Sequence, residues 1–148
     1  MRVRMWLLRC SLGVAAGFAL IQLVPFGRTH TNPSVRKEPP WDAPKTRQLA
    51  ETACFSCHSN ETEWPWYSNV APMSWLLQRD VNQGRAELNF SRWDIEQKEA
   101  EDAAETVAEG SMPPLRFLLA HPGARLDDTE RRALIAGFHA TLGRAEAD

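Results

Sequence analysis

The chain has 148 residues, the length of one domain rather than two. It carries 17 basic and 19 acidic residues. All of the acidic residues and 14 of the basic ones lie beyond residue 26. This anionic part argues against a nucleic-acid-binding surface. It mildly favours basic partners, and a surface that only keeps the protein soluble explains it equally well. The three Cys imply no disulfide framework, because two share one motif and Cys10 lies in an apolar stretch.

Residues 1–26 have the pattern of a membrane segment. The segment opens with three basic residues and no acid, Arg2, Arg4 and Arg9. From Trp6 it has 21 residues, about 31 Å of helix, which is enough to cross a bilayer. No Ala-x-Ala cleavage site follows, so we favour an uncleaved signal anchor over a signal peptide cleaved on secretion. The basic start predicts a single pass through a bacterial cytoplasmic membrane, with the C-terminal part in the periplasm.

Residues 27–40 are polar and hold three of the ten prolines. This composition predicts an extended linker that separates the membrane segment from a domain over residues 41–148. His30 lies in the linker, and we expect it to be solvated rather than bound to a metal.

The next helix should begin at an Asp42 N-cap, with Pro44 in its first turn, and lead into Cys54-Phe55-Ser56-Cys57-His58. The Cys-x-x-Cys-His spacing is that of a c-type haem attachment site. Residues three apart lie on one face of a helical turn, so Cys54 and Cys57 can both reach the two vinyl groups of one haem. His58 can then place an imidazole nitrogen on the iron.

Two other chemistries use a Cys-x-x-Cys pair. A zinc site needs four ligands, and the sequence offers no second Cys pair or His cluster to complete them. A thioredoxin-like dithiol should follow a strand in a β-α-β pattern, and no such strand is predicted before residue 54. Haem attachment is therefore the favoured interpretation.

Five Trp lie beyond the membrane segment, two of them in the aromatic stretch that follows the motif, Trp64–Asn69. Large rings commonly form a core or the wall of a haem pocket. The sharper hypothesis is that Trp66, Tyr67 or Arg79 hydrogen-bonds a haem propionate.

The remaining pattern is helical, with no period-2 run long enough for a strand. A helix is predicted over 72–88, and another should open with a capping box at Ser91 and run to about Glu109. A short helix fits 113–121. The last helix should be capped at Asp127, with four side chains facing inward: Leu134, Ile135, Phe138 and Leu142. The predicted fold is a small all-α, cytochrome c-like domain around one haem, preceded by a transmembrane helix.

A second axial ligand decides what the iron does. Met112 lies in Gly110-Ser111-Met112-Pro113-Pro114, where glycine ends the preceding helix and two prolines stiffen the backbone. A distal thioether raises the reduction potential, which suits electron transfer. Met73 falls on a helical stripe typical of core methionines. The nitrogen alternatives are His121 and His139, and an open position is a further one.

The chain resembles the small bacterial haem-binding domain family of c-type cytochromes. The resemblance rests on CFSCHSNETEWPWYSNVAPMSWLLQRDVNQGRAELNFSRW, on GSMPPLRFLLAHPGARL and on the closing helix, and it covers about residues 30–148. It implies one haem c held by Cys54, Cys57 and His58, with the MPP segment near the iron.

These observations favour a membrane-anchored monohaem electron carrier, which would pass electrons through an exposed haem edge to redox partner proteins. The alternatives are a peroxidase-like enzyme and a gas sensor, both of which need an open distal position. Met112 ligation favours the carrier over the enzyme.

Overall fold

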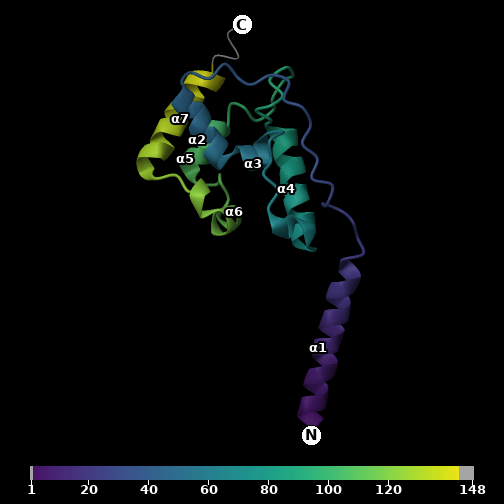
Figure 1. The fold of residues 1–148 in the computed structure, drawn as a ribbon. Coiled ribbons are helices and arrows are strands. Elements are labelled where there is room, and N and C mark those ends of the chain that lie inside the picture. The colour runs from purple at the N-terminus through teal and green to yellow at the C-terminus, as the bar shows by residue number, and fades with distance from the viewer. Residues whose placement is uncertain (1, 144–148) are drawn as a thin grey trace. The chain divides into compact units, whose positions relative to one another are not determined.

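The structure is a computed structural model that describes residues 2–143. Residue 1 of the predicted anchor and residues 144–148 of the predicted haem-binding domain lie outside the described residues. Figure 1 shows that the described residues form helices joined by loops. They contain no strand, and their one isolated bridge pairs Lys37 with Arg92. The all-α prediction is therefore confirmed.

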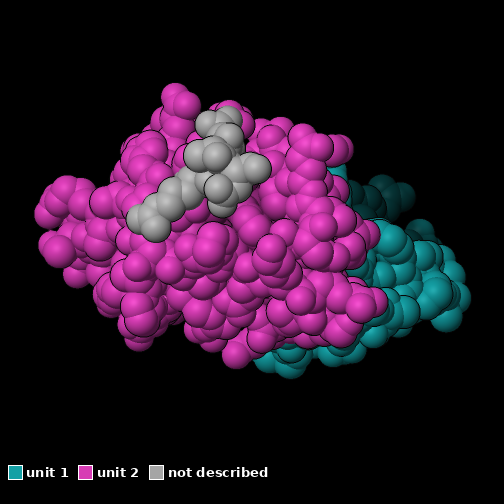
Figure 2. Space-filling view, turned by 90° about the horizontal axis from the view of Figure 1, so that it is seen from above, with its two compact units in different colours: residues 1–31, 64–80 teal, residues 32–63, 81–148 magenta. Residues whose placement is uncertain are grey.

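The residues form two compact units, coloured separately in Figure 2. Unit 1 comprises residues 1–31 and 64–80, and unit 2 comprises residues 32–63 and 81–148. Helix α4 (Met73–Glu87) begins in unit 1, and its residues from Val81 onward belong to unit 2.

In unit 1, helix α1 (Arg2–Ile21) has no buried side chain. Its 20 residues span about 30 Å, and it is the one described helix long and apolar enough to cross a membrane. A signal sequence at this position would have the same properties. The helix ends at Ile21, before the predicted limit of the segment at residue 26, because Pro25 cannot continue a helix.

The rest of unit 1 packs around the single-turn 3-10 helix η1 (Trp66–Asn69) and the start of α4. His30 stacks on Trp64 with ring centroids 4.8 Å apart, and its Nε2 lies 2.8 Å from the Ser68 hydroxyl. The expectation that His30 is solvated is therefore wrong, since its imidazole is half-buried between an aromatic ring and a polar partner.

Residues 32–40 belong to unit 2 and form backbone hydrogen bonds with other residues of that unit. The Arg36 N–H donates to the Ser91 carbonyl at 2.9 Å, and the Trp93 N–H donates to the Lys37 carbonyl at 2.9 Å. This stretch thus lies against the loop after α4 as an extended strap.

Unit 2 contains five further α-helices and the short 3-10 helix η2 (Pro122–Ala124). The five are α2 (Pro44–Ala53), α3 (Phe55–His58), α5 (Ala103–Glu109), α6 (Leu115–Ala120) and α7 (Asp128–Leu142). Phe90 is 1% exposed at the centre of its core. Its ring lies 5.4 to 6.4 Å from four other aromatic rings, those of Trp41, Phe55, Trp93 and Phe138.

The N-cap of α2 is Ala43 and not the predicted Asp42. The Asp42 carboxylate instead accepts a hydrogen bond from the Thr141 hydroxyl at 3.0 Å, and that hydroxyl accepts from the Asp42 N–H at 3.1 Å. The aspartate therefore joins the start of α2 to the end of α7, two segments that are far apart in the sequence.

The helix predicted from Ser91 to Glu109 forms only in its second half, as α5. The expected cap fails because the Ser91 hydroxyl accepts from the Asn60 N–H at 2.9 Å instead of from its own segment. The Gln97 side chain also accepts from the Asn89 N–H at 2.7 Å and donates to the Arg92 carbonyl at 2.7 Å. These bonds replace helical ones and hold residues 89–102 as turns.

The final helix begins as predicted. The Asp127 carboxylate accepts from the N–H groups of Thr129 and Glu130 at 2.7 and 2.8 Å, and the Glu130 carboxylate accepts from the Asp127 N–H at 3.1 Å. This is a complete capping box. Farther along the helix, the side chains of Leu134, Phe138 and Leu142 are buried in the core.

Candidate functional site

The Cys-x-x-Cys-His pentapeptide forms a tight helical turn at the end of α2. Cys54 closes α2 and opens α3, and its carbonyl accepts from the N–H groups of Cys57 and His58 at 3.1 and 2.9 Å. Phe55, which lies between Cys54 and Cys57 in the sequence, is buried and stacks on Phe90 with ring centroids 5.6 Å apart. The hydrophobic core therefore anchors one side of the turn, while both Cys and the His remain half-buried.

A hydrogen bond to the backbone indicates the tautomer of His58. Its Nδ1 lies 3.0 Å from the Leu88 carbonyl oxygen. A carbonyl only accepts, so Nδ1 carries the proton and Nε2 keeps the lone pair. Burial lowers the pKa of His58, which favours the neutral imidazole. A neutral ring whose other nitrogen donates to a carbonyl is the usual arrangement of a metal-ligating histidine.

Helix α4 approaches this turn very closely at Gly84. A Cβ atom at this position would lie 2.6 Å from the Cys57 carbonyl oxygen and 3.1 Å from the Cys57 Cβ. Any larger residue would therefore push α4 away from the motif. Arg85, the next residue, donates from Nε to the Ser59 carbonyl at 2.7 Å and from Nη2 to the Thr62 hydroxyl at 3.0 Å. These contacts fix the chain on the far side of His58.

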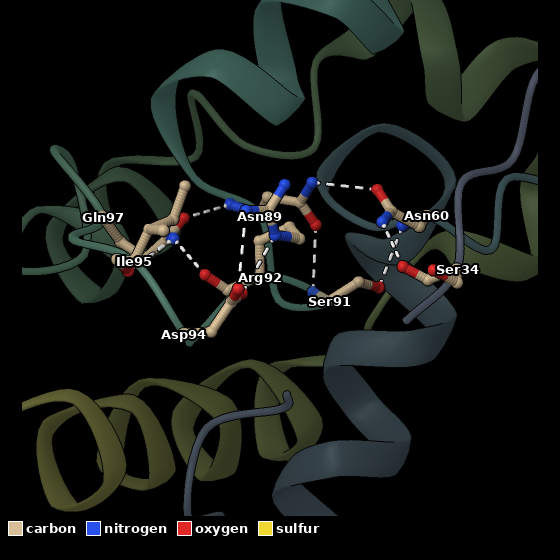
Figure 3. Close-up of polar contacts among 8 residues, drawn as sticks. All are labelled: Ser34, Asn60, Asn89, Ser91, Arg92, Asp94, Ile95 and Gln97. Carbon is tan, nitrogen blue, oxygen red and sulfur yellow. Dashed lines mark hydrogen bonds and ion pairs between the residues drawn. The ribbon is translucent and has the colours of Figure 1, made fainter. Parts of the chain in front are cut away.

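A buried polar network supports the same region (Figure 3). Asn89 follows Leu88, and its amide donates to Asn60 Oδ1 at 3.0 Å while its own oxygen accepts from the Ser91 N–H at 2.9 Å. Asn60 in turn donates to the Ser34 carbonyl at 3.0 Å. The network holds the backbone around the Leu88 carbonyl. The sequence motifs did not indicate Asn60 or Asn89, whose one signal is that they lie close in sequence to His58 and Leu88.

Neither Cys54 nor Cys57 forms a disulfide in the structure. Burial, together with the nearby Cys57, raises the pKa of Cys54 to about 12. Exchange-active dithiols instead have an attacking thiol with a lowered pKa, so this environment does not favour a redox pair. Over residues 2–143, no group of three or more His, Cys, Asp or Glu side chains gathers to hold a metal ion.

Met112 belongs to unit 2 and follows α5. Gly110 ends that helix in the left-handed conformation, with φ of 76°, as the sequence predicted. The Met112 N–H then donates to the Thr106 carbonyl at 3.2 Å, and the Ser111 hydroxyl donates to the same oxygen at 3.0 Å. The backbone at Met112 is thus fixed, while its side chain remains 41% exposed.

The alternative axial ligands lie in different settings. Met73 is in unit 1 and is as exposed as Met112, so it does not fill the core as predicted. His121 ends α6, where its ring stacks on Phe117 at 4.2 Å and its Nδ1 lies 3.2 Å from the Phe117 carbonyl. His139 is exposed on α7.

The three residues suggested for a haem propionate lie in unit 1. Trp66 and Tyr67 are on η1 and meet edge to face, with centroids 5.8 Å apart, while Arg79 is exposed on α4. Trp66 is 79% exposed, and burial raises the pKa of Tyr67. The structure therefore gathers Cys54, Cys57 and His58 into one turn and leaves the other predicted site residues on separate elements.

The motif fits a covalently held haem, because two Cys that form no disulfide and a neutral imidazole occupy one turn. The chain matches the family model of a haem-binding domain over residues 16–140, most of its length. No curated relative and no solved structure matches the chain. The family match supports haem as the cofactor and agrees with the resemblance seen in the sequence. The chain belongs to the haem-binding domain family.

Proposed function

We propose that the protein is a monohaem c-type cytochrome that carries electrons on the periplasmic side of a bacterial membrane. The observation that carries this proposal is the 3.0 Å bond from His58 Nδ1 to the Leu88 carbonyl, in the same turn as two Cys that form no disulfide. In this proposal Cys54 and Cys57 form the thioethers, and His58 Nε2 is the first axial ligand.

Met112 is the proposed second axial ligand. Its backbone is fixed by the bond to the Thr106 carbonyl, and the residue is exposed rather than packed in the core. Sulfur ligation favours ferrous iron and fills the position that a peroxidase or a gas sensor would keep open. We therefore propose a carrier rather than an enzyme.

The protein's own residues would set the conditions for electron transfer. A bound haem would supply a one-electron iron couple. The Leu88 carbonyl orients the His58 ring and raises its basicity, and burial around Cys54 restricts water. The net charge of −5 beyond residue 26 favours basic redox partners.

Helix α1 is the proposed membrane anchor. Its length and full exposure support a single span, and the three arginines near its start support a cytoplasmic N-terminus. The binding of a propionate by Trp66, Tyr67 or Arg79 stays a prediction, and so does the division into segments 1–26, 27–40 and 41–148.

One set of spectra tests the proposed carrier. The purified full-length protein should show a six-coordinate low-spin haem when oxidised and when reduced, and carbon monoxide should leave the reduced spectrum unchanged. Rapid carbon monoxide binding to the reduced protein would indicate an open distal position and would contradict electron transfer as the main function.

A further inference from the structure

Two stretches of unit 1 that lie beside the end of α1 contain no charged residue. Residues 64–78 contain no Asp, Glu, Lys or Arg, although 24% of the whole chain is charged. Residues 22–27, which follow α1, are also without charge. These two stretches belong to unit 1, together with α1 itself.

Hydrogen bonds join the two stretches at the exit of the helix. Gln22, the first residue after α1, donates from Nε2 to the Ala71 carbonyl at 3.0 Å, and its Oε1 accepts from the Ala71 N–H at 3.0 Å. Arg28 Nη2 also donates to Gln22 Oε1 at 2.9 Å. The first turn of α4 therefore lies beside the end of α1.

Large apolar side chains are exposed on both sides of this joint. On α4, Met73 is 41% and Leu76 is 49% exposed, and their spacing of three residues places them on one helix face. We define the interfacial surface as these two residues, the exposed Trp66 of η1 and three residues that follow α1: Leu23, Val24 and Phe26.

We propose that the interfacial surface is embedded in the headgroup region of the lipid bilayer that α1 crosses. Tryptophan and apolar side chains are enriched at this depth, whereas charged ones are costly there. The Gln22–Ala71 bonds argue for lipid rather than a protein partner, because they hold Met73 beside the point where the chain leaves the membrane. Trp66 in the headgroups leaves Tyr67 and Arg79 as the propionate candidates.

This inference rests on the proposed membrane anchor, and the experiment separates the two. The full-length protein is reconstituted in vesicles of phosphatidylcholine and phosphatidylglycerol, and spin labels are placed at Met73→Cys and Leu76→Cys in a Cys10→Ala background. Label accessibility to oxygen, which partitions into lipid, is compared with accessibility to a water-soluble nickel chelate. The background variant without an added Cys corrects for labelling at Cys54 or Cys57.

A label at Ile95→Cys is the matched control, because Ile95 is an apolar residue of unit 2 that is 53% exposed. The oxygen-to-nickel ratio at positions 73 and 76 should be at least about fivefold higher than at position 95. A label on the native Cys10 reports on the anchor. Suppose that the Cys10 label is in lipid, but the labels at positions 73 and 76 have the same oxygen-to-nickel ratio as the label at position 95 or are shielded from both reagents. The proposed interfacial surface would then be wrong, while the membrane anchor would stand. If Cys10 is aqueous, both are wrong.

Discussion

Gly84 lies where α4 touches the Cys-x-x-Cys-His turn, and its lack of a side chain sets how close the two come. In an open helix, replacing glycine by alanine stabilises the protein by up to about 1 kcal/mol. Here we expect Gly84→Ala to destabilise it by roughly 1–3 kcal/mol, because the new Cβ would overlap the Cys57 carbonyl. Denaturant unfolding of the haem-loaded protein measures the difference.

Gly123→Ala is the control for Gly84→Ala, since nothing lies within 4 Å of a Cβ at Gly123. It should change the free energy of unfolding by less than about 0.5 kcal/mol. Equal effects at the two positions would mean that α4 does not constrain the motif.

Met112→Ala tests the second axial ligand. The variant should lose the sulfur-to-iron charge-transfer band of the oxidised protein, and its reduction potential should fall, because axial ligands move haem potentials over a range of about 0.8 V. Met73→Ala, which removes an equally exposed methionine of unit 1, should leave both the band and the potential unchanged. Loss of the band in Met73→Ala and not in Met112→Ala would reverse the assignment.

The sequence indicated the contiguous part of the candidate site. Cys54, Cys57 and His58 form a motif whose spacing carries its chemistry, and Gly110 indicated the helix end before Met112. The partners of the motif could not be predicted in this way. Gly84 and Leu88 lie 27 and 30 residues beyond Cys57 and His58, and Leu88 acts through its carbonyl, which every residue type has.

Among the helices, α7 offers the clearest test of a local sequence signal. Asp127→Ala removes the acceptor of two N–H bonds, so we expect a loss of about 1 kcal/mol and a fall in melting temperature of several degrees. Asp128→Ala is the control, because this neighbouring acid lies in the first turn but makes no capping bond. Equal changes of melting temperature in the two variants would argue against a stabilising cap at Asp127.

The helix predicted to start at Ser91 shows why such signals fail elsewhere. The Ser91 pattern and the Asp127 pattern are both capping boxes in sequence, yet only the second one forms. The Ser91 hydroxyl accepts from the Asn60 N–H, so it does not cap its own segment. The side chains of Asn89 and Gln97 accept from the N–H groups of Ser91 and Asn89, so these bonds are not helical. Propensity and caps are weak compared with a buried hydrogen-bond network of this kind.

For the molecule as a whole, composition and hydrophobic pattern predicted an all-helical fold after an apolar N-terminal helix, and both are found. They did not predict that residues 27–40 would be held to the folded parts, because polar and proline-rich segments usually form free linkers. Backbone bonds at Arg36 and Lys37 explain the difference.

Covalent haem attachment is the claim on which the proposed function depends. The most direct test is to denature the purified protein in acidified organic solvent and to measure the haem that stays with the polypeptide, with the pyridine haemochrome spectrum of that fraction. We predict that the wild-type chain retains one haem with saturated vinyl positions, and that a Cys54→Ala, Cys57→Ala double variant retains none. Extraction of the haem from the wild-type chain, or its retention by the double variant, would contradict attachment through these two residues.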